Sequence, residues 1–202
     1  FVMTKKLMAL LLAVLMAVSL LPMPALADGA TTITTLDPEQ IAQGGSYVLD
    51  KNVTDITLTA PLTISKDVTI ELTGQTVTLQ LPEGGNYADS SVFHVTENGS
   101  LTLKGSGTVK VPDSASGVFV AKDAAVTISG EVSISGGANG VKATSGESRV
   151  KISVNTLGTI ESNVGINLSG ASGEIKIASG TVKGSVCAIG LAEGRTLKLA
   201  DI

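Results

Sequence analysis

The sequence predicts an all-β fold, a parallel β-solenoid with about 24 residues and three short strands per coil. Apolar β-formers alternate with Thr or charged residues along most of the chain, and turn-forming Gly and Asn separate these runs. The pattern of runs then repeats along the sequence. Alternation alone suits any all-β fold, so the repeat is the observation that favours a solenoid.

Residues 1–27 are typical of a secretory signal peptide. Two lysines precede the apolar run 7–21, two prolines follow it, and the small residues Ala25 and Ala27 mark a cleavage site. The run is shorter than the roughly 20 residues that span a bilayer. We therefore expect cleavage after Ala27 and a secreted or cell-surface location, without membrane insertion. An uncleaved anchor helix is the alternative, which the helix-breaking prolines disfavour.

The composition of the rest of the chain excludes several classes of protein. Outside the signal the only aromatic residues are Tyr47, Tyr87, Phe93 and Phe119, so the core must be aliphatic. The formal net charge is −4, and it becomes −6 without the two signal lysines. This charge argues against binding to nucleic acid or to an anionic membrane surface. Cys187 is the only cysteine and cannot form an internal disulfide.

Aliphatic residues recur about two dozen positions apart. We expect residues 28–61 to form an entry segment and a partial first coil, and residues 62–202 to form the coils. The predicted inward columns include Val95, Val120, Ala143, Leu168 and Leu191; Leu101, Val126, Val150, Ile175 and Leu197; and Val109, Val132, Ile160 and Val182. Members of a column would lie about 4.8 Å apart in neighbouring coils. The last residues stop part-way round a coil, which suggests truncation at the C-terminus.

Three stretches, 44–50, 62–77 and 92–103, resemble the opening of pectin-lyase-like right-handed parallel β-helix domains of bacterial cell-surface proteins. The resemblance covers most of residues 44–200. In place of the usual Asp-Leu-Asn-Gly corner the chain has Glu-Leu-Thr-Gly at 71–74, which keeps the glycine bend. The resemblance implies right-handed coils and a fold class that includes polysaccharide lyases and hydrolases.

The residues do not support catalysis. Enzymes of the resembled class use clustered carboxylates, a basic residue or paired Asp on neighbouring coils, whereas the acidic residues here are scattered singly. Arg149 and Arg195 are expected to pair with Glu147 and Glu193 at the surface. His94 alternates outward and is expected to be a surface residue. We predict no catalytic residue, no metal site and no cofactor.

One candidate binding surface is a column of outward residues on the second strand. The predicted column contains Thr102, Thr127, Lys151, Lys176 and Lys198, and its three lysines could bind an anionic glycan. The alternative is a self-neutralising surface ladder, because Glu147, Glu174 and Glu193 lie just upstream in the same coils. The pattern favours the alternative.

The other candidate is the insertion 81–91, which lengthens one corner. It carries Tyr87, Glu83, Asn86 and Asp89. The tyrosine ring and the acidic side chains could contact a sugar or a cation. An ordinary polar loop is the alternative. The shortage of aromatic residues counts against a dedicated sugar platform.

These observations together favour a non-catalytic, exported surface protein that acts as a rigid stalk or display scaffold in adhesion or glycan contact. The expected partner is a polysaccharide or a host or cell-wall glycan, and the segment is expected to be a monomeric part of a larger protein. The alternative is the N-terminal part of a polysaccharide lyase or glycoside hydrolase whose catalytic coils lie beyond residue 202.

Overall fold

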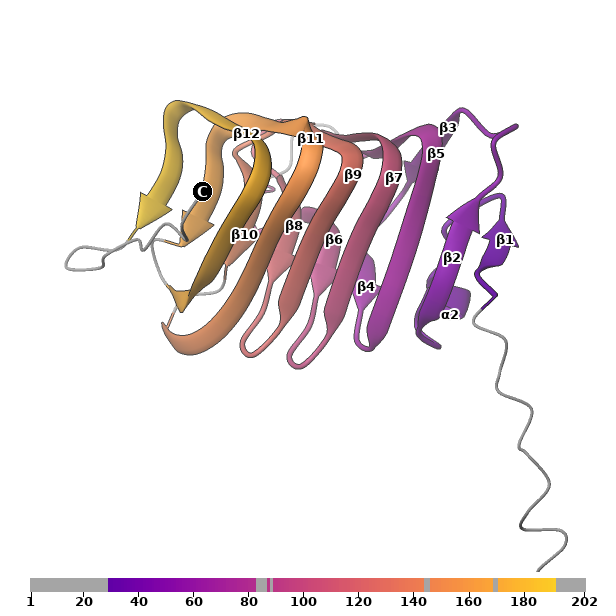
Figure 1. Ribbon diagram of the computed structural model, residues 1–202, viewed down its shortest axis with the longest axis horizontal. Coiled ribbons are helices and arrows are strands. Elements are labelled where there is room, and N and C mark those ends of the chain that lie inside the picture. The colour runs from indigo at the N-terminus through magenta and orange to yellow at the C-terminus, as the bar shows by residue number, and fades with distance from the viewer. Residues whose placement is uncertain (1–28, 83–86, 88, 144–145, 169–170, 192–202) are drawn as a thin grey trace, which may run out of the picture.

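The chain folds as an all-β parallel solenoid of about five turns, with about 25 residues per turn (Figure 1). This computed structural model describes residues 29–82, 87, 89–143, 146–168 and 171–191. The predicted signal segment, Glu83, Asn86, Arg195 and Lys198 lie outside these residues. Every strand pairing is parallel, and each coil lies beside the next along a single axis.

Each complete coil has three faces, which we number in chain order. Face 1 is formed by β4, β6, β8 and β10, and by residues 164–168 and 187–191 of the last two strands. Faces 2 and 3 are formed by the two halves of long strands that bend between them. The elements are β1 (Thr31–Ile33), α2 (Pro38–Ile41), β2 (Gly45–Leu49), β3 (Asp55–Leu58), β4 (Leu62–Ile64), β5 (Asp67–Leu79), β6 (Ser91–Val95), β7 (Ser100–Val111), β8 (Ser116–Val120), β9 (Ala125–Gly136), β10 (Asn139–Ala143), β11 (Gly146–Leu168) and β12 (Ala171–Leu191).

The core consists of aliphatic columns that run along the solenoid axis. On face 1, Val95 is opposite Val120, Val120 is opposite Ala143, and Leu168 is opposite Leu191, which confirms the predicted first column. On face 2 the inward column contains Val68, Leu101, Val126, Ile152 and Ile175, all at most 7% exposed. Alternating residues point inward on each face, so the columns join into one continuous core.

In two of these predicted columns the register is wrong by two residues at one coil. Val126 is opposite Ile152 and not Val150, and Val109 is opposite Ile134 and not Val132. A strand pattern with a period of two keeps the same residues inward when the register shifts by two. Val150 and Val132 are therefore still buried, and the sequence alternation could not reveal the shift.

Glycines permit the close approach of successive coils at the start of face 1. A Cβ added at Gly117, Gly140 or Gly165 would lie 2.5–2.6 Å from the backbone carbonyl oxygen of the next coil. The same Cβ at Gly140 would lie 2.4 Å from Ile160 Cγ2 in the core. Any side chain at these positions would therefore push two coils apart.

The N-terminal end of the core is covered by β1 and α2. Asp37 caps α2 by accepting a hydrogen bond from the backbone N–H of Glu39 at 2.9 Å, and Pro38 begins the helix. Ile41 and Leu36 are buried, and the Tyr47 hydroxyl on β2 donates to the Gln40 carbonyl at 2.8 Å. Inward apolar residues of the first coil are thus shielded from water. The described part of the chain contains no helix long and apolar enough to cross a membrane.

Candidate ligand-binding groove

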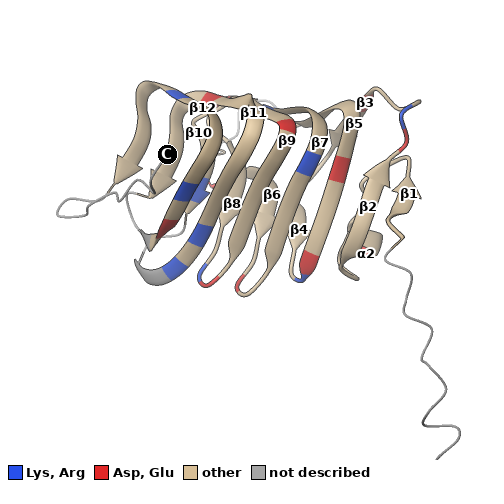
Figure 2. Ribbon diagram, in the orientation of Figure 1, with Lys and Arg blue, Asp and Glu red and all other residues tan. Residues whose placement is uncertain are grey.

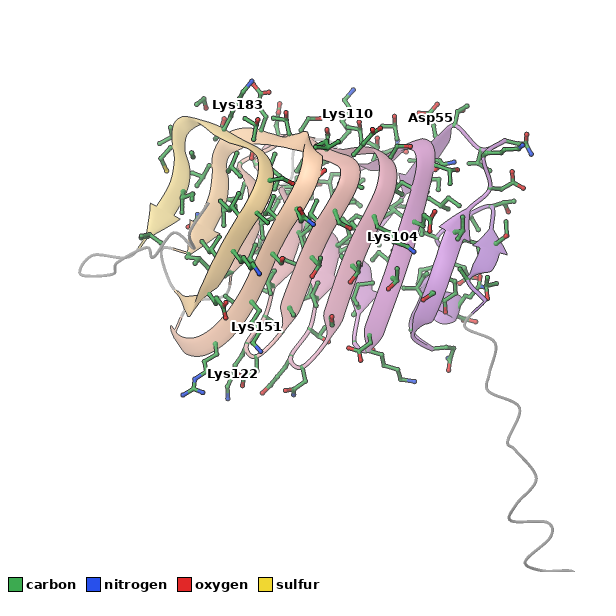
Figure 3. The ribbon with its side chains drawn as sticks, viewed as in Figure 1. Asp55, Lys104, Lys110, Lys122, Lys151 and Lys183 are labelled. Atoms are coloured by element: carbon green, nitrogen blue, oxygen red, sulfur yellow. The ribbon has the colours of Figure 1, made fainter. Side chains whose placement is uncertain are left out.

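A groove of about 1140 Å³ runs along the corner where face 3 turns into face 1. It crosses four successive coils, from the β7–β8 turn to β12. Its lining comprises Asp113, Ser114, Ser135, Gly136, Gly137, Ala138, Glu161, Ser162, Asn163, Lys183, Gly184, Ser185 and Ala188. Figure 3 shows Lys183 at the upper edge of the molecule, on the same side as Lys110 and Asp55.

Small residues make this corner concave. Gly136 and Gly137 have φ values of 87° and 70°, a left-handed conformation that glycine adopts without strain. A Cβ at Gly137 would lie 2.3 Å from Val111 Cγ1. The tight turn therefore requires glycine, and the absence of side chains there leaves room for a ligand.

The lining of the groove is suited to hydrogen bonding. The Ser185 hydroxyl donates to Asn163 Oδ1 at 3.1 Å, and the Asn163 backbone N–H donates to the Gly137 carbonyl at 3.1 Å. Glu161 is opposite Ser135 on one neighbouring strand and Lys183 on the other. Hydroxyls, an amide and charges of both signs thus line one continuous surface, which suits a ligand rich in hydroxyl groups.

The predicted corner loop precedes this groove at the same corner, one coil earlier. Tyr87 is half-buried, and its hydroxyl donates to the Pro82 carbonyl. The Asp89 carboxylate is 97% exposed and accepts a hydrogen bond from Lys142 Nζ on β10 at 3.2 Å. This ion pair ties the loop to face 1, two coils away in the stack.

The predicted lysine column is wrong in register. Lys151 is opposite Ala125 and Glu174, whereas Lys176 is opposite Ser153. Lys151, Lys176 and Glu174 nevertheless line one shallow hollow of about 220 Å³ on face 2. Both basic and acidic side chains occur on this face, as at the Lys104–Glu71 pair, in which Lys104 Nζ lies 3.0 Å from Glu71 Oε2 (Figure 2). The face therefore carries mixed charge and no stack of three lysines within the described residues.

His94 has an aromatic neighbour that the sequence analysis did not identify. Its ring centroid lies 4.8 Å from that of Phe119, with the two rings tilted by 42°. Burial lowers the pKa of the His94 imidazole, because a less solvated site disfavours the charged form. The predicted pairing of Val95 with Val120 could have identified this contact, because it places His94 and Phe119 side by side on the two strands.

Among the described residues, no group of three or more His, Cys, Asp or Glu side chains could hold a metal ion. Arg149 is exposed on β11, and the side chain of its predicted partner Glu147 lies outside the described set.

No family model matches the chain, and no curated protein and no solved structure matches it either. The site must therefore be interpreted from its own geometry.

Proposed function

We propose that this protein is an exported, non-catalytic β-solenoid scaffold that presents the corner groove to a polysaccharide at the cell surface. The observation that supports the proposal most directly is the continuity of the groove across four coils. A linear glycan also repeats along its length and offers hydroxyl groups on every unit. Ser, Asn, Glu and Lys side chains with exposed backbone at glycines could accept and donate hydrogen bonds to such a chain.

A stack of parallel coils is suited to a scaffold. The strands of each coil pair only with strands of the neighbouring coils, and the inward column of face 2 from Val68 to Ile175 is continuous from β5 to β12. Each coil lengthens the molecule along a single axis. A rigid stack of this kind holds a binding surface at a fixed distance and orientation from the ends of the solenoid. The signal-like segment and the resemblance to cell-surface β-helix domains support an exterior location.

Retention on immobilised polysaccharides tests the proposal. The substitution Ser135→Phe places a ring in the groove, and we expect it to lower retention at least tenfold. Thr102→Phe is the matched control, because Thr102 is an outward, half-buried residue of β7 on face 2. Equal retention of Ser135→Phe and the native protein would contradict groove binding, and release of shortened glycans would contradict the non-catalytic assignment.

A further inference from the structure

Two of the rings outside the core lie side by side on face 1. Among the described residues, Tyr47 and Phe93 are buried, and the other rings are Tyr87, His94 and Phe119. His94 and Phe119 are outward neighbours on face 1, and Tyr87 lies in the loop that leads into β6. Only 2% of the residues in the chain are Phe, Trp or Tyr, so an outward pair of rings is a distinctive feature of the surface.

The column that contains the two tilted rings continues with polar groups. Lys142 is opposite Phe119, and Asn167 is opposite Lys142. The Asn167 amide donates to Asn139 Oδ1 at 2.8 Å, and Lys142 is bound to Asp89 at 3.2 Å. Face 1 therefore presents a half-buried aromatic pair followed directly by oriented hydrogen-bonding groups.

We propose that this part of face 1 is a second contact site, formed by His94, Phe119, Lys142 and Asn167, that recognises an uncharged sugar ring. The tilted rings offer apolar surface to the C–H groups of a pyranose, and the lysine and the amide offer polar contacts to its hydroxyls. This inference rests on the proposed function, because it names the class of glycan and a second place of contact.

The charges around the site favour an uncharged ligand. Asp89 neutralises Lys142, the only cation in the column described. Burial lowers the pKa of the His94 imidazole and so favours its uncharged form. The formal net charge of the whole chain is −4, which repels polyanions at long range. A uronic-acid polymer would therefore bind more weakly than a neutral polymer of the same length.

His94 is the only histidine in the chain, so its imidazole protons give a single NMR reporter at the site. The probes are linear hexasaccharides of glucan, galactan, mannan and xylan, with hexagalacturonate as the acidic counterpart. We expect at least one neutral hexamer to shift the His94 resonances, and hexagalacturonate to bind at least tenfold more weakly. Phe119→Ala should weaken binding of that neutral hexamer about tenfold, whereas Thr127→Ala on face 2 should leave it unchanged.

The possible results separate this inference from the proposed function. Binding that is blocked by Ser135→Phe, leaves the His94 resonances unmoved and survives Phe119→Ala would overturn the face 1 site and leave the groove proposal intact. Preference for hexagalacturonate would overturn the assignment to uncharged sugars. Failure of every hexamer and of the immobilised polysaccharides to bind would count against both proposals. Circular dichroism of each variant checks that the solenoid is retained.

Discussion

Individual glycines determine how closely the coils can stack. At Gly117, Gly140 and Gly165 the backbone of the next coil occupies the space that a Cβ would need. The residue type at these positions is therefore set by backbone packing. Elsewhere an added Cβ would fit at ordinary contact distances, as at Gly190, where the nearest atom is Val164 Cγ1 at 3.4 Å.

We expect Gly140→Ala to lower the free energy of unfolding by about 1–3 kcal/mol, because the new methyl group overlaps Ile160 and the Gly165 carbonyl. Gly190→Ala is the matched control on the same face and should change stability by less than about 0.5 kcal/mol. Urea unfolding followed by circular dichroism measures both. Similar losses for the two variants would show that coil spacing does not depend on Gly140.

The elements show which structural features could be predicted from the sequence. Alternation along 68–72 and 101–103 predicted which side chains point inward, since strand geometry fixes that choice. It could not distinguish Val150 from Ile152 as the partner of Val126, because both alternatives bury the same face. The groove was missed because the small residues that make its corner concave carry no chemical motif, and its charged residues come from different coils.

The short helix α2 illustrates a second limit. Four residues cannot produce a periodic helical pattern, so the sequence predicted only an entry segment for 28–61. The capping signal was present in Asp37-Pro38, an N-cap residue followed by a proline in the first turn. Its packing role could be identified only once the coil that it covers was known.

We expect Ile41→Ala to lower the free energy of unfolding by about 2–4 kcal/mol, because it removes a fully buried side chain from the covered end of the core. Gln43→Ala, at an exposed position just after the helix, should have an effect below about 0.5 kcal/mol. Chemical denaturation of both variants provides the comparison. A loss below about 1 kcal/mol for Ile41→Ala would mean that α2 does not protect the first coil.

At the scale of the whole molecule, the register of the coils places the surface features. It places the corner loop one coil before the groove, and it brings His94 and Phe119 together from positions 25 residues apart. It also places Lys176 two residues away from Glu174, the direct partner of Lys151, so the two lysines do not stack. Both proposed glycan contacts therefore depend on the same stacking of coils.

Disulfide trapping across face 2 measures this register directly. With Cys187 replaced by Ser, cysteines at Thr127 and Ser153 would be direct partners on adjacent parallel strands, about 4.8 Å apart, within disulfide range. Cysteines at Thr127 and Lys151 would be offset by two residues and too far apart. We predict that mild oxidation cross-links the 127/153 pair and leaves 127/151 reduced. Cross-linking of 127/151 instead, or of neither pair, would contradict the stacked-coil register.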